Sequence, residues 1–418
     1  MLESLHVRPQ ICTRIRSGPL GDGVDRFAEA LHRHAYAASV IRRYVRASDI
    51  FSRWLSRHRL AAKDVTEIVV GRFVSQLKRW RPPSRSSGRV SDVATGVRHL
   101  AAFLDEAGVV VQPPHAEADT DADRWLRSFE VYLTDVKGVA PGTRRIYLRY
   151  ARAFVEASFG TGPVIWSTLA AQGIANFVQT HAATLCPSAC RAPVTAIRVF
   201  LRFLVTAGEL RAGLEGAVPT VRQWKLAALP RVLSDEDVQR VLARVNETCT
   251  AGRRDRAVLL LLTRLGLRAS EVAALRVDDI DWRDGHLRLR PGKTQRERRL
   301  PLPSDVGDAL VAVLQCRPTT APQQALFVRA RPPYRVLTAA AVTGLAQRAL
   351  RRADITVVRG GAHVFRHTVA SRLVQRGVSM KAVADVLGHA RLETTAIYAK
   401  LDLDTLASVA LPWPGGAR

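Results

Sequence analysis

The stretch from residue 363 to residue 398 constrains the fold of this chain most, because glycines mark its turns and apolar spacing marks its helices. Apolar residues recur three and four positions apart up to Gly377, which stands where a helix would end. Ser379 can cap a second helix, and Gly388 follows the end of that helix. A threonine further on can cap a short third helix that carries Tyr398. The pattern predicts three consecutive helices separated by tight turns.

Polar side chains gather along these three predicted helices. His363 and Arg366 are three residues apart, so they share one face of the first helix. His389 leaves the turn after the second helix, and Tyr398 lies nine residues further on. Together these four side chains could converge on one anionic group. A zinc site on His363 and His367, four residues apart, is disfavoured because no glutamate adjoins the first histidine.

Two segments upstream carry further motifs. Residues 263–281 contain Arg268 and Glu271, and residues 292–302 contain Gly292-Lys293-Thr294 followed by Arg298-Arg299-Leu300-Pro301. Across residues 229 to 405, under half of the chain, the motifs resemble in their order those of the tyrosine recombinases of the phage-integrase family. The resemblance consists of an arginine box, a lysine-bearing hairpin, His363-x-x-Arg366-His367, Leu387-Gly388-His389 and Tyr398.

The resemblance implies a role for each matching residue. Tyr398 would be the nucleophile that forms a 3′-phosphotyrosine link and releases a 5′-hydroxyl, and Lys293 would be the general acid. His363 would accept the tyrosine proton or hydrogen-bond the phosphate, and His389 would hold a phosphate oxygen. Glu271 would orient Arg268 or a histidine. The implied catalytic residues are Arg268, Lys293, His363, Arg366, His389 and Tyr398, with no metal, no ATP and no other cofactor.

These residue types suit the cleavage of a phosphodiester. Charge grows on its two non-bridging oxygens in the transition state, so fixed cations and an acid for the leaving oxygen are needed. Arg268 and Arg366 supply planar, always-charged forks. The ammonium of Lys293 can give up a proton, which a guanidinium effectively cannot. A covalent link to Tyr398 would conserve the energy of the broken bond, so strands could be rejoined without ATP.

The composition narrows the class of partner. A formal net charge of +26 favours a polyanion, and nucleic acid is the usual one. No apolar stretch is long enough to span a membrane, and the amino terminus has no signal-peptide pattern. Five cysteines in 418 residues are too few for a disulfide framework. We expect a protein of the reducing cytoplasm, bacterial and nucleoid-associated when bound to DNA.

Two segments in the first half of the chain carry similar aromatic residues. Tyr44 and Phe51 in the first recur as Tyr147 and Phe154 in the second, and a similar offset of about 100 residues relates further aromatic pairs. Each segment shows helical apolar spacing over about four helices. The near-constant offset predicts an internal duplication of a small helical domain.

These features predict the domain organisation. The boundaries are a flexible leader over 1–25, a first helical copy over 26–111, a linker over 112–123, a second copy over 124–212, a linker over 213–230, a catalytic domain over 231–405 and a tail over 406–418. In the resembled family a helical domain of this kind precedes the catalytic domain and closes around the DNA duplex. The second copy would therefore be the core-binding domain, and the first would contact DNA or a partner. Candidate DNA contacts in basic loops are Lys78, Arg79, Arg81, Arg144, Arg145 and Arg149.

We therefore expect a mainly α fold with a small antiparallel β-sheet in the catalytic domain, preceded by two helical SAM-like domains. The expected function is site-specific recombination of double-stranded DNA, of the integrase or transposase type, by a tetramer or an assembly with sister recombinases. One alternative is a DNA-binding accessory protein that keeps the fold without cutting. Another is a type IB topoisomerase, which shares the chemistry and relaxes supercoils as a monomer. The tail after Leu401 would pack either on a neighbouring subunit or on its own domain.

Overall fold

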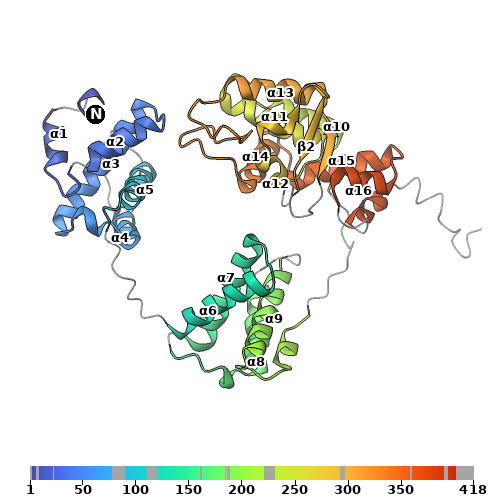
Figure 1. The fold of residues 1–418 in the computed structure, drawn as a ribbon, viewed down its shortest axis with the longest axis horizontal. Helices are drawn as coiled ribbons and strands as arrows, with labels where there is room; N and C mark the ends of the chain where they lie inside the picture. Colours follow the sequence, from blue (N-terminus) through green and yellow to red (C-terminus); the bar gives the residue numbers. More distant parts are fainter. Residues whose placement is uncertain are drawn as a thin grey trace, which may run out of the picture. The chain divides into compact units, whose positions relative to one another are not determined.

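The computed structural model describes residues 2–5, 9–21, 23–77, 90–110, 120–160, 162–183, 185, 189–220, 231–291, 297–357, 360–389 and 394–401. The chain divides into two compact units, one of residues 112–227 and one of residues 1–111 together with 228–418. Within the latter unit, the residues before and after the middle unit have hydrophobic cores of their own. We therefore describe an amino-terminal body (2–110), a middle body (120–220) and a carboxy-terminal body (231–401), each by itself (Figure 1). In the part of the chain that the structure describes, no helix is long and apolar enough to cross a membrane.

Helices are the only regular secondary structure in the described residues of the amino-terminal body. Its core is built from one face of each helix, with Phe27, Phe51 and Phe73 buried at its centre. Its elements are η1 (Leu2–Leu5), α1 (Pro9–Arg16), α2 (Gly23–Arg33), α3 (Ala38–Arg57), η2 (Ala62–Asp64), α4 (Glu67–Leu77) and α5 (Val90–Glu106).

The expectation of a flexible leader over residues 1–25 is wrong. Pro9 is the first residue of α1, a position where the missing N–H of proline costs nothing. Leu2, Ile15 and Leu20 are buried in the same core as Phe27. Apolar side chains on each short element therefore anchor the segment, and its glycines and prolines lie at helix ends and turns instead of preventing helices.

The middle body repeats the aromatic contacts of the amino-terminal body. The Phe51 and Phe73 rings lie 4.9 Å apart between α3 and α4, and the rings of Phe154 and Phe177 lie 5.1 Å apart between α7 and α8. Matching contacts at the matching sequence offset support an internal duplication. The elements of the middle body are α6 (Asp121–Val131), the π-helical turn η3 (Tyr132–Val136), α7 (Pro141–Phe159), η4 (Trp166–Thr168), α8 (Ala171–Ala183), α9 (Arg191–Thr206) and η5 (Leu214–Ala217).

The first residues of the expected linker over 213–230 belong to the middle body. Val218 is buried in its core, and its carbonyl accepts a hydrogen bond from Arg198 Nη2 at 3.1 Å. The turn η5 also packs on that core through Leu214 and Ala217. Apolar residues among the glycines hold this part of the chain in place, so that a linker could begin only after Val218.

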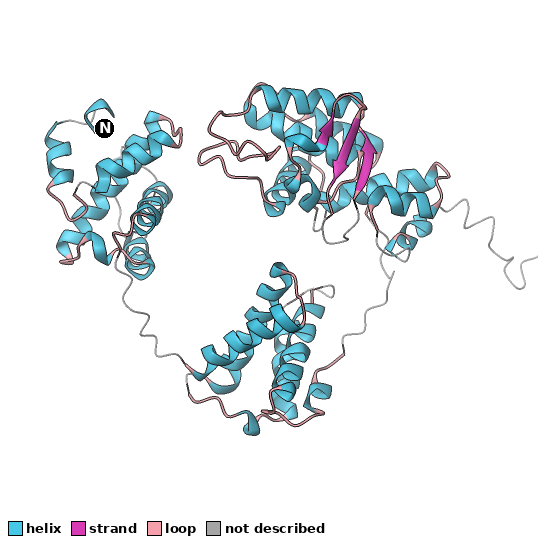
Figure 2. Ribbon diagram, viewed as in Figure 1, coloured by secondary structure: helices cyan, strands magenta, loops and turns pink. Residues whose placement is uncertain are grey.

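The carboxy-terminal body combines helices with one small sheet, which confirms the predicted fold class (Figure 2). The strands β1 (Ile280–Asp281), β2 (His286–Leu289) and β3 (Arg298–Pro301) pair antiparallel in that order, with Leu287 opposite Leu300. Its helical elements are α10 (Asp235–Ala243), α11 (Thr250–Arg264), α12 (Ala269–Ala274), η6 (Val277–Asp279), α13 (Ser304–Gln315), α14 (Ala339–Arg352), α15 (Ala362–Gln375), α16 (Met380–Leu387) and η8 (Ala396–Leu401).

Two features of this body position the candidate site. The apolar run from Ala257 to Leu262 in α11 is fully buried and forms the centre of the core. The three predicted consecutive helices are present as α15, α16 and η8, with Ser379 Oγ accepting a hydrogen bond from the backbone N–H of Ala382 to cap α16. Gly388 ends α16 in the left-handed conformation, at φ 62°. Further along the chain, η8 contacts α15.

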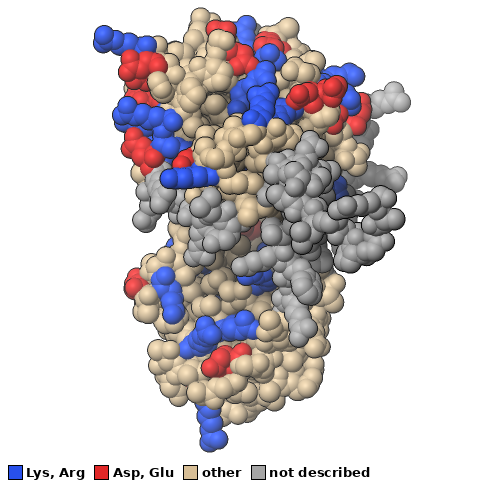
Figure 3. Space-filling model, turned by 90° about the vertical axis from the view of Figure 1, so that its right-hand side faces the viewer, with Lys and Arg blue, Asp and Glu red and all other residues tan. Residues whose placement is uncertain are grey.

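Charged side chains of both signs share the surface drawn in Figure 3. On that face blue Lys and Arg side chains lie among red Asp and Glu side chains instead of forming one uninterrupted basic sheet. On this face the positive net charge of the chain is therefore not gathered into a single basic patch.

Candidate active site

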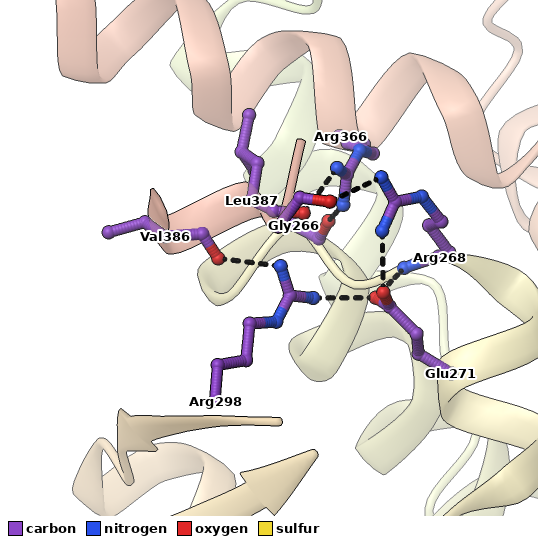
Figure 4. A network of polar contacts seen from close by, with 8 residues as sticks. Gly266, Arg268, Glu271, Arg298, Arg366, Val386 and Leu387 are labelled. Carbon is purple, nitrogen blue, oxygen red and sulfur yellow. Dashed lines mark hydrogen bonds and ion pairs between the residues drawn. The ribbon is translucent and has the colours of Figure 1, made fainter. Parts of the chain in front are cut away.

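The carboxyl end of α16 is the centre of the candidate site. Three successive carbonyl oxygens there, those of Val386, Leu387 and Gly388, each accept a hydrogen bond from a different arginine. The last carbonyls of a helix have no partner within the helix, and they carry the negative end of its dipole. The end of α16 therefore gathers three guanidinium groups in one place (Figure 4).

Arg268 immediately precedes α12 and reaches the end of α16 from there. Its Nη2 donates to the carbonyl of Gly388 at 2.9 Å, and its Nη1 donates to Glu271 Oε1 at 2.7 Å. Glu271, in the first turn of α12, also accepts a hydrogen bond from the backbone N–H of Arg268. The carboxylate therefore fixes both the start of the helix and the direction of the arginine side chain.

Arg366 on α15 is buried, with 5 % of its surface exposed. Its Nη1 donates to the carbonyl of Gly266 at 2.8 Å and its Nη2 donates to that of Leu387 at 2.6 Å. Burial, with the nearby charge of Arg268, lowers the pKa of Arg366 to about 10. The group stays charged at neutral pH, and within the described residues two of its five N–H donors are engaged.

Arg298 on β3 is the third arginine of the set. Its Nη1 donates to the carbonyl of Val386 at 2.9 Å, and its Nη2 donates to Glu271 Oε2 at 2.8 Å. Burial lowers the pKa of Arg298, while Glu271 opposes that effect. Two of the three guanidinium groups, those of Arg268 and Arg298, contact the Glu271 carboxylate. The net charge of the set is positive, which suits an anion with several oxygens.

His389 follows Gly388 and is buried against the residues before η8. Its Nδ1 lies 2.7 Å from Thr395 Oγ1. Burial, followed by the charges of Arg366 and Arg268, lowers the pKa of His389 to about 4. The imidazole is therefore neutral at neutral pH and has a single N–H, which lies on Nε2 when Nδ1 accepts from the Thr395 hydroxyl.

Tyr398 on η8 is almost completely buried, with 2 % of its surface exposed. It packs in a small apolar cluster with Val374 of α15 and Leu387 of α16. Its hydroxyl lies 2.9 Å from Nδ1 of His367 on α15. Burial raises the pKa of Tyr398, and Arg366 and Arg268 oppose that rise. A tyrosine hydroxyl thus lies beside an imidazole and within the field of two arginines, which is the environment of an activated nucleophile.

Comparison with known proteins identifies the family. Residues 231–404 match the family model described as the phage integrase family. A protein of Sinorhizobium fredii named as an integrase/recombinase, y4rA, is 35% identical over 409 residues, which cover 97% of each chain. The tyrosine recombinase XerA of Thermococcus kodakarensis is 30% identical over 282 residues, covering 67% of this chain and 92% of the relative. The chain belongs to the phage integrase family of tyrosine recombinases.

Solved structures of tyrosine recombinases share this fold. XerH recombinase bound to its difH substrate matches with a TM-score of 0.52 at 18% identity, over 83% of this chain and 97% of XerH. A lambda integrase dimer bound to a core site matches with a TM-score of 0.51 at 16% identity, over 66% of this chain and 94% of that one. At these identities the likeness shows the fold alone.

In this tyrosine recombinase the structure gathers most of the predicted catalytic residues. Arg268, Arg366, His389 and Tyr398 lie around the end of α16, and Glu271 contacts Arg268 as expected of an orienting residue. Lys293 lies outside the described residues. His363 lies in the first turn of α15 with an exposed side chain, unlike the buried Arg366 three residues later.

The residues predicted to contact DNA lie in two different bodies, and only some of them are among the described residues. Lys78, Arg79 and Arg81 lie outside the described residues. Arg144 donates to Thr134 Oγ1 at 2.8 Å within its own body. Arg145 and Arg149 are exposed on α7, and Arg149 lies over the ring of Tyr150. In the part of the chain that the structure covers, no group of three or more His, Cys, Asp or Glu side chains could hold a metal ion.

Two residues of this site were missed by the sequence analysis. Arg298 stands in the matched block of residues 298–302, but its partners are a carbonyl and a carboxylate remote in the chain. His367 adjoins Arg366 in the motif and was considered only as a zinc ligand. Its spacing could have indicated a role, because His367 follows His363 by one helical turn and therefore lies on the same side of the predicted helix.

Proposed function

We propose that this protein is a site-specific DNA recombinase that cleaves and rejoins strands through a covalent 3′-phosphotyrosine intermediate on Tyr398. The observation that carries the proposal is the convergence of Arg268, Arg366, His389 and Tyr398 on the end of α16. Separate elements contribute these residues, and together they supply cations, a neutral donor and a nucleophile.

The chemistry follows from these groups. The guanidinium groups of Arg268 and Arg366 hold the non-bridging oxygens of the scissile phosphate and stabilise the charge that develops on them. With Nδ1 accepting from the Thr395 hydroxyl, His389 donates its single N–H, on Nε2, to a phosphate oxygen. The exposed His363 hydrogen-bonds the same phosphate. Lys293 protonates the leaving 5′ oxygen. Neither ATP nor a metal takes part in this scheme.

Double-stranded DNA is the proposed partner. XerH and lambda integrase, which share the fold, were solved bound to DNA. The exposed Arg145 and Arg149 are suited to backbone phosphates because they lie four residues apart, on one face of α7. We further propose that the middle body is the core-binding domain and that the amino-terminal body is a second module, which contacts DNA or a partner. The active assembly would be a tetramer, or an assembly with sister recombinases, that acts on two duplexes. The proposed setting is the bacterial cytoplasm, in association with the nucleoid.

The test is the capture of a covalent adduct on a suicide substrate. Nicked duplexes tiled across the DNA that flanks the gene are incubated in EDTA with wild-type protein and with Tyr398→Phe. We expect a protease-sensitive protein–DNA adduct with the wild type only. A supercoil-relaxation assay on the same preparations distinguishes a recombinase from a type IB topoisomerase.

Each other outcome has a definite meaning. An adduct that also forms with Tyr398→Phe would assign the nucleophile to another residue. Wild-type protein that binds the duplexes and forms no adduct on any of them would favour the non-cleaving accessory protein.

A further inference from the structure

We propose that His367 is the general base that takes the proton from the Tyr398 hydroxyl as this tyrosine attacks the scissile phosphate. The inference rests on the proposed function and assigns a step within it to a residue that has no role in that scheme. Its basis is the 2.9 Å contact between His367 Nδ1 and the hydroxyl of Tyr398. This distance is that of a direct hydrogen bond, which a general base needs with the proton it removes.

The direction of this hydrogen bond follows from burial. Tyr398 is 2 % exposed, and among the described residues the structure gives its hydroxyl no second partner. A buried O–H group without an acceptor is costly, so the phenol donates and His367 Nδ1 accepts. His367 is then in the tautomer with its proton on Nε2, and its Nδ1 lone pair points at the proton to be removed.

The other two histidines near the site are less suited to this step. His389 Nδ1 is engaged with Thr395 Oγ1 at 2.7 Å, and its ring stacks on that of Tyr398 with centroids 6.4 Å apart. His363 is exposed at the start of α15, and no contact between it and Tyr398 occurs in the described structure. Only His367 directs a ring nitrogen at the hydroxyl, so the geometry separates three residues that motif spacing treats alike.

The charges around His367 keep it available as a base. Burial lowers the pKa of His367, and His363 and Arg366 on its own helix lower it further. His389 after α16 and Tyr398 on η8 are the titratable groups that face it from the neighbouring elements. The imidazole is therefore neutral at neutral pH, and its Nδ1 lone pair can take up the proton of the hydroxyl that donates to it. Burial also raises the pKa of Tyr398, so the phenol needs a base to become a nucleophile.

The step balances in atoms and charge. The phenolic oxygen of Tyr398 forms the new bond to phosphorus while its proton moves to Nδ1 of His367. The bond from phosphorus to the 5′ oxygen breaks, and that oxygen leaves with a proton from the general acid. When the 5′-hydroxyl of a strand attacks the phosphotyrosine, its proton passes to the deprotonated general acid. The bond from phosphorus to the tyrosine oxygen breaks, and the imidazolium of His367 returns its proton to that oxygen.

The experiment compares His367→Asn with wild type on whichever nicked duplex gives the wild-type adduct. Asparagine keeps a hydrogen-bond acceptor near the position of Nδ1 but cannot take up a proton. We expect single-turnover adduct formation to slow by about 10²–10⁴-fold at neutral pH, with DNA binding unchanged within about twofold. The wild-type rate should rise with pH and level off once His367 is neutral. The variant rate should keep rising as the tyrosine ionises.

A modified duplex separates the base from the acid. Where sulfur replaces the scissile 5′ oxygen, the leaving thiolate needs no acid, so a defect in the base persists and a defect in the acid disappears. Equal rates and pH profiles for wild type and His367→Asn, or recovery of the variant on the sulfur duplex, would overturn the proposal. Failure of the wild type to form any adduct would instead overturn the proposed function.

A second measurement leaves His367 unchanged. Nitrogen NMR of histidine-labelled wild-type protein at pH 7.5 should show His367 protonated on Nε2, and Tyr398→Phe should shift its Nδ1 signal. A proton on Nδ1 at this pH would reverse the hydrogen bond and overturn the assignment, whether or not a cleavable duplex has been found.

Discussion

Arg298 and Arg299 are neighbours on β3, yet of the two only Arg298 contacts other residues of the candidate site. Its guanidinium joins Glu271 to the carbonyl of Val386, whereas Arg299 is exposed. Lysine at position 298 has no planar fork and cannot make both bonds in this geometry. We expect Arg298→Lys to slow adduct formation by about 10–100-fold, because losing a residue that orients substrate-binding groups commonly has an effect of this size. Arg299→Lys is the matched control. Measured single-turnover rates that are equal for the two variants would show that Arg298 does not position the site.

The depressed pKa of His389 predicts how stability depends on pH. Its folded-state pKa of about 4 lies below the ordinary value of 6.5, so between these values the unfolded chain binds a proton that the folded protein does not. Stability therefore falls as the pH is lowered through this window. His389→Asn, which keeps a partner for Thr395, removes the effect. The cost of this substitution, measured by urea denaturation, should shrink by on the order of 2–3 kcal/mol between pH 6.5 and pH 4. A cost that stays constant across the window would contradict the shift.

Single residues also show how far the sequence could predict the site. Arg268, Arg366, His389 and Tyr398 could be selected because motif order and spacing carry them. Arg298 could not, since its partners are a backbone carbonyl and a carboxylate whose positions depend on how β3 packs against α12 and α16. Spacing also could not show which of His363 and His367 contacts Tyr398, because one turn of helix separates the two histidines. Only the folded structure shows that it is His367.

At the scale of elements, the end of α16 depends on a glycine for two reasons. Gly388 has a φ of 62°, and a Cβ there would lie 3.0 Å from Cζ of Arg298. Gly377, after α15, has a φ of 78° with nothing within 4 Å of such a Cβ. Alanine should cost about 1–2 kcal/mol at either position through backbone strain, but only Gly388→Ala should also displace Arg298. We expect Gly377→Ala to keep the rate of adduct formation and Gly388→Ala to lose most of it. Equal rates of adduct formation for the two variants would show that the close approach of Gly388 to Arg298 does not matter for the reaction.

Element prediction succeeded where apolar periodicity was strong and failed where turn residues were frequent. The buried run of α11 and the three helices from α15 to η8 followed from spacing and caps. In the first 25 residues Pro9 and the glycines indicated disorder, although each short element between them buries apolar side chains in the amino-terminal core. Local breakers show where a helix stops, and only tertiary contacts show whether the pieces stay folded.

At the scale of the whole molecule, separate hydrophobic cores predict separate stability. The middle body has its own core, in which Phe154 and Phe200 are fully buried. A fragment of residues 112–227 should therefore fold alone and unfold cooperatively in circular dichroism. Phe154→Ala should destabilise that fragment by about 3–5 kcal/mol, because a buried ring leaves a cavity.

The amino-terminal body offers a matching variant in the full chain. Phe51 occupies in the amino-terminal body the place that Phe154 has in the middle body, buried and in contact with the aromatic residue of the next helix. In the full chain each substitution should lower only the thermal transition of its own body, and neither should change the transition of the carboxy-terminal body. If Phe154→Ala also lowered the carboxy-terminal transition, the middle body would be coupled to the site in solution. Its role in DNA binding would then have to be separated from a role in holding the site together.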